Sequence, residues 1–185
     1  MWKNQRRSPF VIKASSLTLV AMIVSACASA VAPPPCPQVR LLADGAKLTR
    51  FAPGPGRDII DIVHEEKITG FAQGCEFETD DTGAGTLTVW AAPTIVSSRG
   101  PANTSGRTEF SYFIAATDAQ KNILRRDRYD RAFTYTRDVP RIRWQNPEPE
   151  KIILPLKAGQ NGKDFLVYLS LVLTRDELDY RRKNR

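Results

Sequence analysis

The side chain best suited to proton transfer in this sequence is His64, the only histidine among 185 residues. Histidine titrates near neutral pH, so any histidine-dependent catalysis would have to use it. Residues 59–69 are rich in β-branched side chains, which predicts a strand where Glu66 shares the face of His64 and can approach it. The alternative is a histidine that packs or forms a hydrogen bond at the sheet surface. The sequence favours this alternative, because no Gly-x-Ser-x-Gly nucleophile turn accompanies the histidine.

A second candidate for chemistry is Asp81, which begins an Asp-Thr-Gly sequence. This resembles the motif of aspartic proteases, where the Asp shares a proton with a second Asp because two close carboxylates cannot both ionise. The sequence contains no second Asp-Thr-Gly or Asp-Ser-Gly, and the preceding residues 76–80 are mostly polar. A surface turn is therefore the favoured interpretation.

The first 26 residues have the pattern of a cleaved signal peptide. Residues 1–13 contain four basic and no acidic side chains, and residues 14–26 contain no charge. The apolar centre, residues 17–24, is too short to cross a bilayer, which takes about 20 apolar residues. We therefore expect residues 1–26 to direct export and to be removed.

The end of this leader, Val24-Ser25-Ala26-Cys27, resembles the bacterial lipobox. The resemblance implies that the Cys27 thiol receives a diacylglycerol and that cleavage occurs before it, which anchors the protein to a membrane. Ala28 rather than Asp follows the cysteine. By the best-known sorting rule this favours the outer membrane, with the protein facing the periplasm. A plain signal peptide with an incidental cysteine is the alternative.

The three cysteines are explained together if Cys27 is lipidated, since Cys36 and Cys75 then remain as a pair in an oxidising compartment. We predict a Cys36–Cys75 disulfide, with two buried free thiols as the alternative. One histidine and no Cys-x-x-Cys give little basis for a metal site. We expect neither a metal nor another cofactor.

The net charge of +7 does not indicate nucleic-acid binding. Eight of the 27 basic residues lie in the leader and in the last five residues, and the remaining 19 are balanced by 20 acidic ones. A phosphate-binding face needs clustered charge within the fold. We therefore expect no nucleic-acid partner.

The remaining chain predicts an all-β fold, an antiparallel β-sandwich of about seven or eight short strands, immunoglobulin-like, separated by Gly, Pro, Asn and Asp turns. The expected strands are residues 59–69, 76–78 after a turn at Gly74, 86–91, 110–116, 123–127 continuing at 132–135, 151–156 and 165–173. A capping box, Thr174 to Glu177, predicts a short helical turn through Tyr180. The expected organisation is residues 1–26 signal peptide, 27–35 lipidated tether, 36–180 sandwich and 181–185 basic tail.

Several segments resemble small uncharacterised lipoproteins of proteobacteria. They are residues 36–51, 54–59, 99–101, 112–124 and 171–178. The resemblance covers most of the chain after the leader and implies an immunoglobulin-like or fibronectin-like sandwich. It brings no known activity and no functional residues.

One charged run is the main candidate for binding, and it contains Arg125, Arg126, Arg128, Tyr129 and Arg131. Together with Phe133 it could form a protein-binding edge or contact anionic lipid. The alternative, which the sequence favours, is a solvated edge strand that its charges protect from aggregation.

These features favour a non-enzymatic envelope lipoprotein that binds another envelope protein or supports assembly. A periplasmic hydrolase using His64 with Glu66 or Asp81 is the first alternative. A module that binds a small ligand or glycan is the second, in which case Trp90, Trp144 or Tyr112 would line an apolar cleft.

Overall fold

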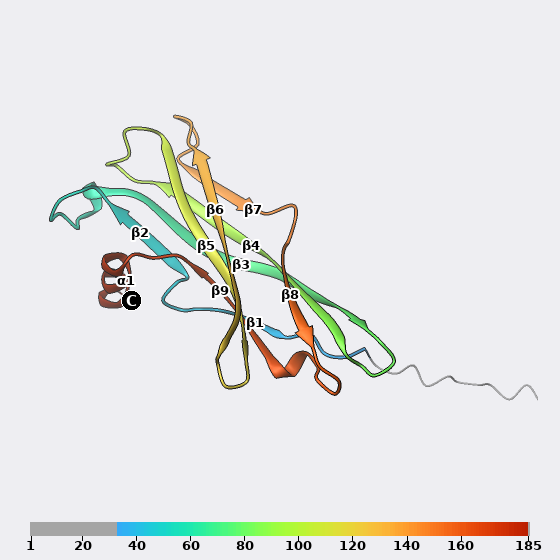
Figure 1. Ribbon diagram of the computed structural model, residues 1–185. Coiled ribbons are helices and arrows are strands. Elements are labelled where there is room, and N and C mark those ends of the chain that lie inside the picture. The colour runs from blue at the N-terminus through green and yellow to red at the C-terminus, as the bar shows by residue number, and fades with distance from the viewer. Residues whose placement is uncertain (1–32, 185) are drawn as a thin grey trace, which may run out of the picture. The chain divides into compact units, whose positions relative to one another are not determined.

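A computed structural model describes residues 33–184 (Figure 1). The leader, Cys27 and most of the expected tether lie outside these residues. The elements of the described part are β1 (Gln38–Leu41), β2 (Lys47–Phe51), η1 (Ile59–Asp61), β3 (Ile62–Thr79), β4 (Gly85–Arg99), β5 (Arg107–Asp118), β6 (Ile123–Thr134), β7 (Arg141–Gln145), β8 (Glu150–Leu156), η2 (Gly162–Asp164), β9 (Phe165–Leu171) and α1 (Arg175–Lys183).

The strands form two sheets. The first has the order β1-β9-β5-β6, and the second has the order β2-β3-β4-β7 with β8 also paired to β4 (Figure 1). This confirms the all-β sandwich with a C-terminal helix. Two details differ from expectation: the described residues contain nine strands, because β1, β2 and β7 were missed, and β1 pairs with β9 in parallel. These three strands have only four or five residues each, too few for alternation to reveal them.

The core lies between the sheets and follows the alternation of the longer strands. On β9, Phe165, Val167, Leu169 and Leu171 are buried. This strand lies between β1 and β5, so both of its edges are paired. Burial of such apolar faces supplies the main driving force for folding. Other buried core residues are Leu48, Ile68, Leu87, Val89, Ile95, Phe110, Tyr112, Ile114, Ile152 and Leu154.

The expected turn at Gly74 was wrong, because β3 continues through it for 18 residues and pairs with the 15-residue β4. Gly74 lies opposite Trp90, and a Cβ on Gly74 would come within 2.3 Å of the indole ring. The glycine therefore leaves room for a large aromatic side chain rather than a turn. The chain reverses only at residues 80–84, where Asp80 accepts hydrogen bonds from the Thr82 and Ala84 backbone amides.

The C-terminal helix α1 begins with the expected capping box, in which Thr174 Oγ1 accepts from the Glu177 amide and Glu177 Oε2 accepts from the Thr174 amide. The helix extends to Lys183 rather than ending at Tyr180, and its last turn contains basic residues that suit the negative helix end. It lies against β2 (Figure 1). No helix in residues 33–184 is long and apolar enough to cross a membrane.

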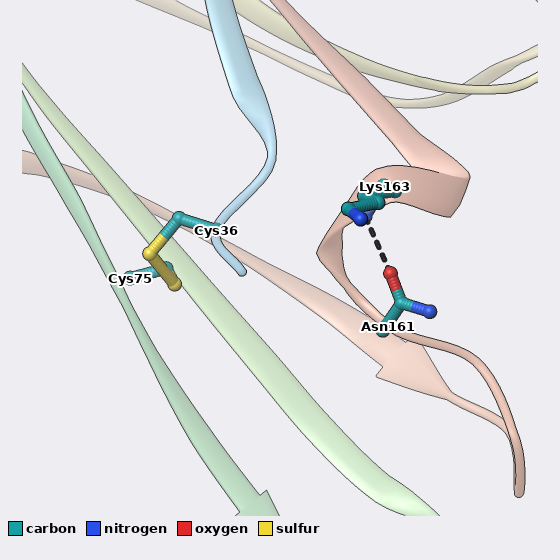
Figure 2. The surroundings of a disulfide bond; sticks show 4 residues. All are labelled: Cys36, Cys75, Asn161 and Lys163. Carbon is teal, nitrogen blue, oxygen red and sulfur yellow. Dashed lines mark hydrogen bonds between the residues drawn. A yellow bond between two sulfur atoms is a disulfide. The ribbon is translucent and has the colours of Figure 1, made fainter. Parts of the chain in front are cut away.

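The predicted disulfide is present between Cys36, which precedes β1, and Cys75 in β3 (Figure 2). It therefore connects the start of the domain to the second sheet. The same end of the fold contains the η2 turn, where Asn161 Oδ1 accepts from the Lys163 amide. A Cβ at Gly162 would lie 2.0 Å from the Pro35 carbonyl oxygen, so glycine permits the close approach of η2 to the entering chain.

Candidate functional site

The charged run of the sequence forms β6, a twelve-residue strand at one end of the first sheet. Strand β5 pairs with one side of β6, and within residues 33–184 no strand pairs with the other. Every residue of β6 is exposed or half-buried. We call the side chains of Arg125, Arg126, Arg128, Tyr129 and Arg131 the β6 surface.

Two ion pairs form along this strand, each between residues two apart that share a face. Arg125 Nε lies 2.8 Å from Asp127 Oδ2, and Arg128 Nε lies 3.0 Å from Asp130 Oδ1. The Arg128 and Asp130 side chains are 62% and 75% exposed, so this pair contributes little to stability and can rearrange when a partner binds. Hydrogen bonds from Ser111 and Arg128 lower the pKa of Asp130, which keeps it anionic.

Two members of the β6 surface rest on aromatic rings of β5. The Arg126 guanidinium carbon lies 4.1 Å from the centre of the Phe113 ring, a cation–π contact. The Tyr129 ring lies 5.3 Å from the Tyr112 ring. Partial burial raises the pKa of Tyr129 to about 12, because the anionic phenolate is less well solvated there.

Arg131 faces the other sheet. Its Nη2 forms a short ion pair with Glu150 at the start of β8 and lies 3.2 Å from the Tyr112 hydroxyl. Its guanidinium also lies 5.1 Å from the Trp144 ring centre on β7. Arg131 belongs to the charged run that the sequence indicates as a binding candidate, whereas the structure places it between the sheets.

A cleft of about 610 Å³ lies beside β6, where the chain leaves β9 for α1. Its lining includes Arg50, Glu109, Ser111, Arg128 and Asp130. Arg50 Nη1 donates to the Glu109 carbonyl at 3.0 Å, so β2 of the second sheet helps to form the wall. With charges of both signs, the cleft is suited to polar protein segments rather than to an apolar small molecule.

The histidine and glutamate identified in the sequence lie together, as predicted. His64 Nδ1 is 3.0 Å from Glu66 Oε1, and that oxygen also accepts from Ser97 at 2.9 Å and Thr108 at 3.2 Å. Ser97 Oγ lies 2.5 Å from the Tyr135 hydroxyl. Ser97 lies in β4, Thr108 lies in β5 and Tyr135 directly follows β6, so the sequence of β3 alone could not identify them. Glu66 faces Ser97 across the β3–β4 ladder.

This cluster lies in the interior, not at the sheet surface. His64 is 2% exposed and Glu66 is fully buried. No residue of this His64–Glu66 cluster lines the cleft beside β6. Glu66 Oε2 has no hydrogen-bond partner among the described residues. The arrangement resembles a buried polar network more than a substrate-binding site.

The remaining candidates do not converge on this cluster. Asp81 is exposed in the turn after β3, whereas His64 lies near the other end of that strand. Trp144 is 5.9 Å from Phe133 between ring centres, and Tyr112 is buried, so each is part of the packing between the sheets. Among the described residues, no group of three or more His, Cys, Asp or Glu side chains could hold a metal ion.

No protein-family model matches the sequence, and no curated protein matches it. Among solved structures, the chain is similar to the variable (V) domain of the AgI/II polypeptide BspA from Streptococcus agalactiae. The identity is 9%, and the match covers 71% of this chain and 75% of that chain. The TM-score of 0.17 is too low to carry an argument about function.

Proposed function

We propose that this protein is an exported lipoprotein, anchored through Cys27 to the outer membrane and facing the periplasm, that binds another envelope protein through its β6 surface. It acts as a binding or assembly module rather than as an enzyme. Nucleic acid is not its partner. The lipobox sequence supports the anchor, and the Cys36–Cys75 disulfide is consistent with an oxidising compartment.

The main support for the binding proposal is that β6 is an edge strand of its sheet. An edge strand presents backbone N–H and C=O groups to which an extended segment can add as a further strand. The Arg126 and Arg128 side chains are exposed on this strand, and β6 lines the polar cleft together with β5 and the connection from β9 to α1. Backbone pairing would supply affinity, and the charged side chains would supply selectivity.

A hydrolase is less well supported, because His64 and Glu66 are enclosed between the sheets. A substrate would reach them only if the sheets separated, which would expose the surrounding apolar core at a large cost in free energy. A general base must come within hydrogen-bond reach of its substrate.

The anchor can be tested by membrane fractionation. A Cys27→Ala variant should move from the membrane fraction to the soluble periplasmic fraction, whereas Cys36→Ala should stay in the membrane. Retention in the membrane of Cys27→Ala from which the leader has been removed would contradict lipid anchoring at that residue.

Binding through β6 can be tested in cells with a photocrosslinking amino acid at position 126. A matched control carries it at Arg40, an exposed arginine on β1 at the opposite edge of the same sheet. A partner strand added to β6 would run about 5 Å away, within reach of the probe. We expect a discrete adduct from position 126 and none from position 40. Equal adducts, or none from position 126, would contradict the proposal.

A further inference from the structure

The charged residues on the two sides of Tyr129, at the middle of β6, have opposite signs at equal distances from it. Residues 127–131 are Asp, Arg, Tyr, Asp and Arg, so at equal distances on either side of the tyrosine one residue is acidic and the other basic. Asp127 corresponds to Arg131, and Arg128 corresponds to Asp130. A strand with this pattern is complementary in charge to itself when it runs in the opposite direction.

Two copies of β6 can pair in antiparallel fashion about a two-fold axis, which places one residue opposite itself and its neighbours opposite their counterparts. With the axis at Tyr129, Arg128 faces Asp130 of the second copy and Asp127 faces Arg131 of the second copy. Each contact occurs twice. Residues 124–134 overlap in this register, which is nearly all of the strand. Directly opposite side chains lie on the same face of the sheet, where charges of opposite sign attract.

The neighbouring symmetric registers lack this complementarity. An axis at Arg128 would place Arg126 opposite Asp130, but it would also place Arg128 opposite itself and Arg125 opposite Arg131. An axis at Asp130 would place Asp130 opposite itself. Like charges directly opposite each other are destabilising. The charges that discourage general strand addition therefore permit one particular pairing.

The described structure leaves β6 ready for this pairing. Its outer edge is not paired within residues 33–184, and the Arg128 and Asp130 side chains are 62% and 75% exposed. They already form an ion pair within their own strand. When two strands meet, the two pairs would join into one network of four alternating charges on the outer face. Arg131 already binds Glu150, so the pair that it forms with Asp127 would add less.

We propose that the partner of β6 is a second copy of this chain, joined antiparallel about Tyr129 to give one continuous sheet across two subunits. This inference rests on the proposed binding role of β6 and names its partner. The full chain provides both strands, and no further component is required.

A charge-exchange experiment tests this proposal. The full-length protein, extracted in detergent, is compared with Arg128→Glu and Asp130→Arg by light scattering over a range of concentrations. Each variant places like charges opposite each other in its own dimer, so we expect its dimer dissociation constant to rise about tenfold. In an equal mixture, Glu at position 128 faces Arg at position 130, and the remaining Asp130 faces the remaining Arg128. The mixture should therefore dimerise about as tightly as the unmodified protein.

Arg40→Glu on β1 is the matched control, since it makes the same charge change on the other edge strand and should leave dimerisation unaltered. Thermal unfolding of each variant checks that the fold is kept. Self-pairing would be overturned if the unmodified protein stayed monomeric at every concentration. It would also be overturned if the variants had the same dissociation constant as the unmodified protein and mixing them changed nothing.

The adduct formed from position 126 separates this inference from the proposed function. An adduct between two copies of the chain supports self-pairing and the role of β6 as a binding edge, with a second copy in place of a different envelope protein. An adduct with a different polypeptide overturns self-pairing and leaves the proposed binding role of β6 in place. The lack of any adduct overturns both.

Discussion

Arg131 on β6 and Glu150 on β8 form an ion pair that connects the two sheets of the sandwich. Their side chains are only 25% and 17% exposed, so water screens the pair less than it screens the ion pairs along β6. Asn146 and the Tyr112 hydroxyl also donate to Glu150 Oε1, at 2.8 and 3.0 Å. One end of the β6 surface therefore stabilises the sandwich, while its middle remains available for binding.

Replacing Arg131 should thus reduce stability far more than replacing its neighbour Arg126. Arg131→Met leaves the largely buried Glu150 carboxylate without its cation, so we expect the free energy of unfolding to fall by about 2 kcal/mol. Arg126→Met removes an exposed cation–π contact and should cost about 0.5–1 kcal/mol. Denaturant unfolding of the two variants measures this difference. Equal losses would contradict the distinction between the two arginines.

The Cys36–Cys75 disulfide should stabilise the folded chain by restricting the unfolded one. It links residues separated by 39 positions, and the chain-entropy relation for such a loop gives about 3–4 kcal/mol. The double variant Cys36→Ser, Cys75→Ser should therefore unfold at a lower denaturant concentration. Reductant should lower the stability of the unmodified protein to a similar value and leave the double variant unchanged. A double variant as stable as the oxidised protein would refute this role.

The buried network around Glu66 should depend on Ser97. Ser97→Ala removes a donor to Glu66 and a partner of the Tyr135 hydroxyl in a site with little access to water. Leaving such buried groups unsatisfied costs about 1–3 kcal/mol. Ser98→Ala, at the adjacent half-buried position of β4, removes only an exposed hydrogen bond from Arg141 and should change stability by less than about 0.5 kcal/mol. Chemical denaturation of both variants tests the difference, and a neutral Ser97→Ala would show that the network adds nothing.

Stability should decrease in alkaline solution because burial raises the pKa of Tyr129 to about 12 and that of Tyr112 further. Below pH 10 both tyrosines are protonated in the folded and unfolded chains, and their contribution is fully present. Above pH 10 the unfolded chain releases these protons first, so the free energy of unfolding falls as the pH rises towards 12. Tyr129→Phe should make this decline less steep when unfolding is followed from pH 8 to 12. An unchanged decline would contradict the assignment to Tyr129.

Sequence periodicity identified the long elements because their alternation reflects burial directly. The expected strands at residues 110–116, 123–135 and 165–173 correspond to β5, β6 and β9, with small differences in their bounds. Gly74 was misassigned because its role is to accommodate Trp90, a residue on another strand. Local composition around Gly74 does not reveal which residue of β4 lies opposite it.

Some features of the candidate sites were also predictable from the sequence. The shared face of His64 and Glu66 follows from the two-residue period of a strand, and Cys36 and Cys75 follow from counting cysteines. The two-residue period also places Arg131 on the face of Phe133, but its partners Glu150 and Trp144 come from the other sheet and could not be predicted. The sequence identified the charged strand but not the division of its residues between packing and binding.

The central claim, that β6 is the binding edge, is tested most directly by hydrogen–deuterium exchange of residues 123–134. The full-length protein is measured in the membranes where it was made and again after extraction into detergent and dilution. If a partner strand adds to β6, its outward amides should exchange more slowly in the membrane, while the β1 strand at the other edge exchanges equally in both states. Equal exchange of residues 123–134 in the two states would contradict the claim.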